Sequence, residues 1–125
     1  MAIRRVLLVD DDEDIRLLIQ TALSRLGQMD VLTAASGEQA LQLAATANPD
    51  LVLLDLMMPD LDGWATLDHL RRRPETRDIP VILMTASGEA DEGQLRHAGC
   101  AGVIRKPFNP VKLHHEIHRI LTHHH

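Results

Sequence analysis

The sequence of 125 residues contains no tyrosine, one phenylalanine, one tryptophan and one cysteine. With so few aromatic side chains, its core must be aliphatic. The single cysteine, Cys100, excludes a disulfide framework and fits a reducing compartment. The apolar runs have the length of strands, so no membrane span is expected, and the run near the N-terminus is too short for a signal peptide. We therefore expect one cytoplasmic domain, long enough to bury a core without disulfides or metals.

Negative charge is concentrated in one place. Residues 10–14 are five consecutive carboxylates, and they directly follow the apolar run at residues 6–9. An isolated charge run is most often a solvated loop. This run lies where a buried strand is expected to end, which favours a cation site instead. The formal net charge of −5 argues against direct binding to nucleic acid.

Short apolar runs alternate with segments of helical periodicity along the whole chain. The predicted strands are residues 6–9, 31–34, 51–54, 81–84 and 101–104. The predicted inner faces of the helices are Ile15, Leu18, Ile19, Ala22, Leu23 and Leu26; Ala40, Leu41, Ala44 and Ala47; Trp64, Leu67 and Leu70; Leu95 and Ala98, in a weak helix over 89–98; and Leu113, Ile117, Ile120 and Leu121. This order predicts an α/β fold with a parallel sheet covered on both faces.

Local signals indicate where these helices begin and end. Ser36 and Gln39 form a capping box for the second helix. Asn109 and Pro110 are typical of the first turn of the last helix. Gly27 is expected to end the first helix, and Pro49 the second.

Chemically capable side chains follow four of the five predicted strands. They are Asp10 and Asp11, Asp55, Thr85 and Lys106. In an open parallel sheet, ligands bind at the carboxyl ends of the strands where the winding reverses. Converging carboxylates repel one another unless a cation lies among them, and a site built from oxygen ligands suits Mg²⁺. A magnesium ion beside a carboxylate, a hydroxyl and a lysine is suited to phosphoryl transfer, with the carboxylate as covalent acceptor.

Four motifs carry a resemblance to a known family. They are Val9-Asp10-Asp11, residues 55–63, Met84-Thr85-Ala86 and Lys106-Pro107-Phe108. With these motifs, residues 5–121 resemble the receiver domain of two-component response regulators, of the CheY type. The resemblance implies one doubly wound, flavodoxin-like domain over residues 1–122, with five strands in the order 2-1-3-4-5 and five helices. The histidines at residues 123–125 are interpreted as the remnant of a purification tag.

The resemblance also implies a phosphoacceptor site. Asp55 would accept a phosphoryl group from a phosphohistidine on a histidine kinase or a phosphotransfer protein. Mg²⁺ or Mn²⁺ would be bound by Asp11 and Asp55, by Asp10 mainly through water, and by the backbone carbonyl of Met57. Such a protein is a signalling switch that assists its own phosphorylation and dephosphorylation, and it is not a turnover enzyme.

The remaining motifs imply the phosphoryl-binding and readout residues. Thr85, Ala86 and Lys106 would bind the phosphoryl group, and the Lys106–Pro107 peptide bond would be cis. In the family, the change is read out on the face of helix 4, strand 5 and helix 5, by a downstream target or an attached output domain. The aromatic residue that commonly accompanies this switch is replaced here by Val103, so readout without that aromatic is expected.

Two alternatives remain open at the level of sequence. Asp10, Asp11 and Asp12 contain the D-x-D of haloacid-dehalogenase-type phosphohydrolases, in which Asp10 would be the nucleophile. Against this reading, Glu13 stands where such enzymes usually carry Thr or Val, and the chain is short for a substrate cap. The other alternative is an inert pairing module, which would be expected to lack Asp55, Thr85 or Lys106.

Overall fold

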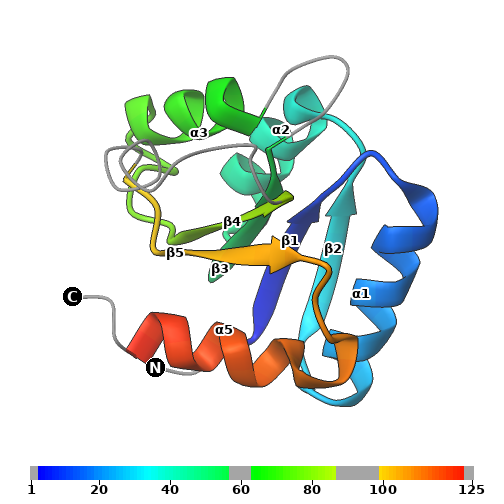
Figure 1. Ribbon diagram of the computed structural model, residues 1–125. Helices are drawn as coiled ribbons and strands as arrows, with labels where there is room; N and C mark the ends of the chain where they lie inside the picture. Colours follow the sequence, from blue (N-terminus) through cyan, green and yellow to red (C-terminus); the bar gives the residue numbers. More distant parts are fainter. Residues whose placement is uncertain (1–2, 57–62, 87–98, 123–125) are drawn as a thin grey trace.

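A computed structural model describes residues 3–56, 63–86 and 99–122, which form a five-stranded parallel sheet with helices on both faces (Figure 1). The strands are β1 (Arg5–Val9), β2 (Asp30–Ala34), β3 (Leu51–Asp55), β4 (Val81–Ala86) and β5 (Gly102–Lys106). The helices are α1 (Glu13–Arg25), α2 (Gly37–Ala47), α3 (Gly63–Arg72) and α5 (Leu113–Thr122), with a 3₁₀ turn η1 (Pro110–Lys112) before α5.

The strand order is β2-β1-β3-β4-β5, which confirms the predicted parallel topology. Four of the five expected helices lie within the described residues. The expected helix over residues 89–98 lies outside them. Among the described helices, none combines the length and apolar character that a membrane crossing requires.

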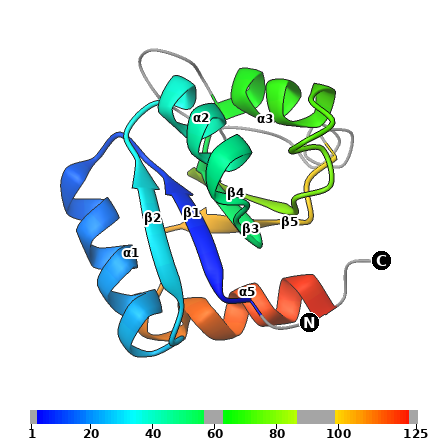
Figure 2. The ribbon, with the colours of Figure 1, turned by 180° about the vertical axis from the view of Figure 1, so that it is seen from behind.

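Alternation along the strands divides the core into two layers. In β1, Leu7 and Val9 join the layer under α2 and α3, whereas Val6 and Leu8 join the layer under α1 and α5. Figures 1 and 2 show these helix pairs on opposite faces of the sheet. Because both faces are covered, the strands are apolar on both sides, as the continuous runs in the sequence indicated.

Helix α1 buries a narrower stripe of side chains than its apolar periodicity predicted. Ile19, Ala22 and Leu23 are buried, but Leu18 and Leu26 are 45% and 48% exposed, so their placement in the core was wrong. A helix that packs against a flat sheet buries only the stripe directly beneath it, and these two residues lie at its margins.

The ends of α1 are set by side-chain and backbone caps. Asp12 is its N-cap, and its carboxylate accepts hydrogen bonds from the backbone N–H groups of Asp14 and Ile15. At the other end, Gln28, and not Gly27, has the left-handed backbone conformation (φ 55°). Gly27 is required for close packing instead, since a Cβ there would lie 3.0 Å from the Cβ of His114.

The second helix follows its sequence signals closely. The Ser36 hydroxyl accepts a hydrogen bond from the Gln39 N–H, as the capping box predicted. The Gln39 side chain accepts in return from the Ala35 N–H. Asn48 ends the helix in a left-handed conformation (φ 48°), just before Pro49.

Arg71 joins three segments at the end of the sheet opposite the strand carboxyl termini. Its guanidinium donates hydrogen bonds to the backbone carbonyls of Arg77, Ile79 and Gly99 at 2.9–3.1 Å. The end of α3 is thereby tied to the segments that lead into β4 and β5. Three consecutive arginines at residues 71–73 are typical of a solvated helix end, and Arg71 departs from that pattern because its guanidinium is bound to three backbone carbonyls.

Replacing Arg71 with Ala should therefore lower the free energy of unfolding by about 2 kcal/mol, because three charge-assisted hydrogen bonds are lost and the partly buried carbonyl of Ile79 loses its partner. Its neighbour Arg72 is exposed and pairs with Asp68 at 2.8 Å. Arg72→Ala is the matched control and should change stability by no more than about 0.5 kcal/mol. Urea unfolding of the two variants measures the difference, and equal losses would contradict a structural role for Arg71.

Candidate functional site

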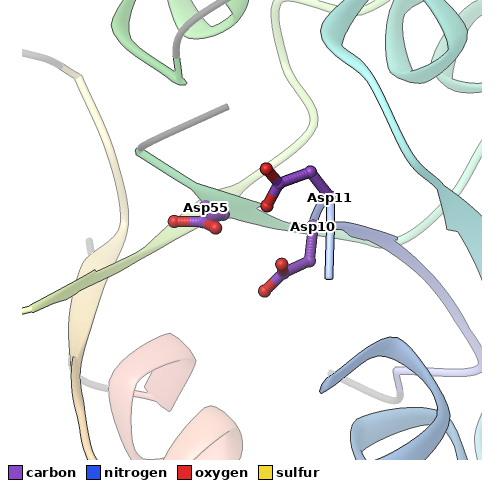
Figure 3. A group of neighbouring side chains, drawn as sticks. All are labelled: Asp10, Asp11 and Asp55. Atoms are coloured by element: carbon purple, nitrogen blue, oxygen red, sulfur yellow. The ribbon is translucent and has the colours of Figure 1, made fainter. Parts of the chain in front are cut away.

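Three aspartates meet where β1 and β3 end. The two strands are adjacent and parallel, with Val9 opposite Leu54, so Asp10 and Asp55 emerge at the same edge of the sheet. Each of Asp10, Asp11 and Asp55 offers a carboxylate oxygen within 4.8 Å of the other two. Figure 3 shows these side chains around one common space. Asp10 and Asp55 are buried (1% and 3% exposed), and Asp11 is exposed.

The backbone of Asp10 is fixed from both sides. Its N–H donates to the carbonyl of Ala34 at the end of β2 (3.1 Å), and its carbonyl accepts from the Arg16 guanidinium on α1 (2.8 Å). The side chain is held through Oδ1, which accepts from the Asp12 N–H at 2.9 Å. The other oxygen, Oδ2, is buried and has no hydrogen-bond partner among the described residues.

Lys106 brings a positive charge to the aspartates from the end of β5. Its Nζ lies 3.3 Å from Asp55 Oδ2 and 3.8 Å from Asp10 Oδ2. The peptide bond from Lys106 to Pro107 is cis. Because the side chain of Lys106 is about one-third exposed, a ligand at this edge can be reached from solvent and from the lysine together.

The electrostatics of the cluster disfavour full ionisation without a cation. Burial is the main cause that raises the pKa of Asp10 from 3.8 to about 6, and the negative charges of Asp55 and Asp11 raise it further. The Asp12 N–H and the Lys106 ammonium act in the opposite direction. One lysine therefore compensates the carboxylates incompletely. A small divalent cation with oxygen ligands fits this donor set, and Asp10 Oδ2 lacks a partner that such a cation would supply.

Of the other predicted site residues, three lie in the described strands and one does not. Thr85 is fully buried in β4, one residue before Ala86, and Ala86 is the register partner of Lys106. Val103 lies on β5, partly buried against the core layer under α2 and α3. Met57 lies outside the described residues, and its predicted role in metal binding stays a prediction.

Sequence reasoning missed two residues that shape the site. Arg16 holds the Asp10 carbonyl, and a helical arginine one turn into α1 carries no signal of that contact. Gly63 begins α3 directly against the end of β3: a Cβ there would lie 2.4 Å from the Asp55 carbonyl oxygen. A glycine shortly after the candidate acceptor was the available signal for this close contact.

The geometry defines a doubly wound domain with an acidic cluster and a lysine at the switch point of its sheet. The family model of the response regulator receiver domain matches residues 6–118. The chain belongs to this family.

Curated relatives and solved structures agree with this assignment. The chain is 40% identical over 119 residues to the "Probable transcriptional regulator ycf27" of Cyanophora paradoxa, and 38% identical over 119 residues to the alkaline phosphatase synthesis transcriptional regulatory protein PhoP of Bacillus subtilis. Each match covers 94% of this chain and 48% of the relative, so the chain spans about half the length of these relatives.

The chemotaxis response regulator CheY4 of Vibrio cholerae has a similar structure, with a TM-score of 0.85 and 30% identity, and the match covers 95% of this chain and 99% of CheY4. The receiver domain of NtrX from Brucella abortus matches with a TM-score of 0.83 at 30% identity, over 94% of this chain and 98% of that domain.

The phosphohydrolase alternative receives no support. That reading needs Asp12 as the second acidic residue of a D-x-D motif. The Asp12 carboxylate accepts hydrogen bonds from two backbone N–H groups of α1, where it serves as a helix cap. The family match points to a receiver domain instead.

Proposed function

We propose that the chain is a phosphoacceptor switch of a two-component pathway, in which Asp55 accepts a phosphoryl group from a phosphohistidine. The observation that carries this proposal is the meeting of three carboxylates with Lys106, whose Nζ lies 3.3 Å from Asp55 Oδ2. Asp55 would attack phosphorus through a carboxylate oxygen as the phosphorus–nitrogen bond of the donor breaks. The product would be an acyl phosphate on Asp55 and a free histidine on the donor.

Several residues around Asp55 would each stabilise part of the phosphoryl group. Phosphorylation adds roughly −1.5 to −2 units of charge in a site that already repels negative charge. Lys106 is placed to pair with one phosphoryl oxygen. The Thr85 hydroxyl and the backbone at Ala86 are proposed to donate to others, since both lie in β4 beside β5. Asp12 and Arg16 hold the loop that carries Asp10 and Asp11.

Asp10, Asp11 and Asp55 fit a Mg²⁺ or Mn²⁺ ion, and the carbonyl of Met57 is proposed as a further ligand. When bound, this ion would supply positive charge against both the carboxylates and the phosphoryl oxygens. The aspartates would orient the ion. The buried Asp10 Oδ2 has no hydrogen-bond partner among the described residues and lies 3.8 Å from Lys106 Nζ, so it is available as a ligand.

Incubation of the chain with a small acyl-phosphate donor tests this function. With Mg²⁺ present, intact-mass spectrometry should detect one added phosphoryl group, and peptide mapping after borohydride trapping should place it on Asp55. A chelator should suppress the reaction by at least about tenfold, because the charge of the incoming group is then uncompensated.

The same assay separates the alternatives. Steady hydrolysis of phosphomonoesters by this chain, or an adduct on Asp10, would support a phosphohydrolase and contradict the proposal. The absence of any adduct on a folded, magnesium-loaded chain would support an inert pairing module. Recovery of the unmodified chain that is faster than loss of the phosphoryl group from the unfolded phosphorylated chain would show that the folded chain assists its own dephosphorylation.

We further propose a histidine kinase or a histidine phosphotransfer protein as donor, and a downstream protein or an attached output domain as target. The readout would use the surface that includes β5 and α5. Since Val103 stands in place of the common aromatic, rotation of a large ring at that position is not available for this readout.

A further inference from the structure

Three histidines gather on α5, away from the aspartates. His114, His115 and His118 lie in the first two turns of this helix. A Cβ at Gly27, which follows α1, would lie 3.0 Å from the Cβ of His114. Helix α1 follows its N-cap Asp12 beside the aspartates and has 13 residues, so its two ends are roughly 20 Å apart. Figure 1 shows the start of α5 beside the far end of α1. The histidines are therefore a separate cluster.

Helix geometry places these imidazoles next to one another. Residues four positions apart in a helix lie on one face, one turn apart, which describes His114 and His118. The ring centroids of His114 and His115 are 4.0 Å apart, with their planes at 35°. Burial lowers the pKa of His114, and the charges of both His115 and His118 lower it further, so both neighbours lie within electrostatic reach of its ring.

One nitrogen of the cluster lacks a partner. His114 Nδ1 is buried and has no hydrogen-bond partner among the described residues. A buried polar atom without a partner is uncommon and costs free energy. An ion ligated at this nitrogen would give it the partner that it lacks. The nearby Glu116 does not compete for the imidazoles, because its carboxylate is paired with Arg119 at 3.1 Å.

We propose that His114 and His118 bind a divalent transition-metal ion, with Zn²⁺ as the probe, on the surface of α5. Imidazole nitrogens are suitable ligands for Zn²⁺, Cu²⁺ and Ni²⁺, and a pair of histidines four residues apart on a helix is the arrangement of helical zinc sites. Mg²⁺ prefers oxygen ligands, so the two sites would select different metals. Within the described residues, only the three aspartates place three ligand atoms within 4.8 Å of one another. The proposed histidine site therefore has two protein ligands, and water would complete the coordination of the ion.

Calorimetric titration with Zn²⁺, in the presence of saturating Mg²⁺ to occupy the aspartates, tests this site. The chain should bind Zn²⁺, and His118→Ala should weaken binding by about tenfold or more, since even loss of an outer-shell partner costs roughly 10–100-fold in metal affinity. His118 is exposed, so the variant should keep its fold, which circular dichroism checks. His69→Ala, an exposed histidine on α3, is the matched control and should leave the affinity unchanged.

The histidines at residues 123–125 are a second potential source of metal binding and lie outside the described residues. Replacing all three with Ala in the full-length chain should preserve most of the affinity. Loss of binding in that variant, with normal binding in His118→Ala, would assign the metal to the C-terminal run and overturn the proposal. In electron paramagnetic resonance, Cu²⁺ bound to the triple variant should show nitrogen ligands, and a spectrum with oxygen ligands alone would likewise overturn it.

Discussion

Asn in place of Asp55 should abolish phosphoryl uptake while leaving the fold intact. The amide has nearly the shape of the carboxylate, but it lacks the anionic oxygen that forms the acyl phosphate. Asp55 is 3% exposed and lies at the end of β3, among side chains already packed on both faces of the sheet. Intact-mass spectrometry after incubation with an acyl-phosphate donor and Mg²⁺ should therefore detect no adduct, which is the largest effect that we expect from a single substitution.

The matched control is Asp68→Asn. Asp68 is an exposed carboxylate on α3 that pairs with Arg72, and it lies outside the aspartate cluster. This variant should accept phosphate as the unmodified chain does. An adduct that persists at full yield in Asp55→Asn, on any other residue, would contradict the assignment of Asp55 as acceptor.

Metal-free protein should become less stable as the pH rises from about 4 to about 6, through the ionisation of Asp10. Its folded-state pKa is about 6 and its ordinary value is 3.8. Between these values the folded state holds a proton that the unfolded state has lost, so stability falls with increasing pH. A shift of this size corresponds to a penalty on the order of 3 kcal/mol, fully present above the folded-state pKa.

Asp10→Asn isolates this contribution from the other carboxylates. The amide keeps an oxygen that can accept from the Asp12 N–H, and it never ionises. In the presence of a chelator, we expect Asp10→Asn to be more stable than the unmodified chain at pH 7.5, by about 2–3 kcal/mol, and the difference to shrink toward pH 4. Urea unfolding at a series of pH values measures it.

Saturating Mg²⁺ should reverse the relative stabilities of Asp10→Asn and the unmodified chain. A cation among the aspartates favours the ionised form of Asp10, so saturating Mg²⁺ should stabilise the unmodified chain at pH 7.5 more than it stabilises Asp10→Asn. Asp68→Asn again serves as control and should respond to pH and Mg²⁺ as the unmodified chain does. A stability difference between Asp10→Asn and the unmodified chain that is independent of pH would refute the assigned shift.

Much of the fold was predictable because strands that are buried on both faces of a parallel sheet appear in the sequence as short, continuous apolar runs. Apolar runs such as residues 51–54 are too short for helices and show no polar alternation, and the structure has β3 there. Helix starts were predictable where a side chain caps the backbone, as at Ser36. Helix α1 was predicted less well: its periodicity places Leu18 and Leu26 on the inner face, and periodicity alone does not tell how wide a stripe the sheet will cover.

Part of the candidate site was also predictable. Side chains that follow parallel strands must emerge at one edge, which places Asp10, Asp55 and Lys106 together before any coordinates are known. The contacts of Arg16 and Arg71 with distant carbonyls were not predictable, because each joins segments whose approach is decided by packing. Nothing in the local sequence of either arginine marks it as different from a solvated one.

By itself, the sequence determined the fold class and the edge of the sheet at which the acidic residues gather, since both follow from periodicity and from the positions where the strands end. The candidate acceptor, Asp55, followed from the resemblance of its motifs to a known family. Only the tertiary structure decided that Asp10 Oδ2 is buried without a hydrogen bond, that Lys106 approaches Asp55 more closely than Asp10, and that His114 packs over Gly27. These are relations between side chains of different elements. They depend on the register and twist of neighbouring strands and on how closely the helices pack against the sheet and against one another. Local sequence patterns do not specify these distances.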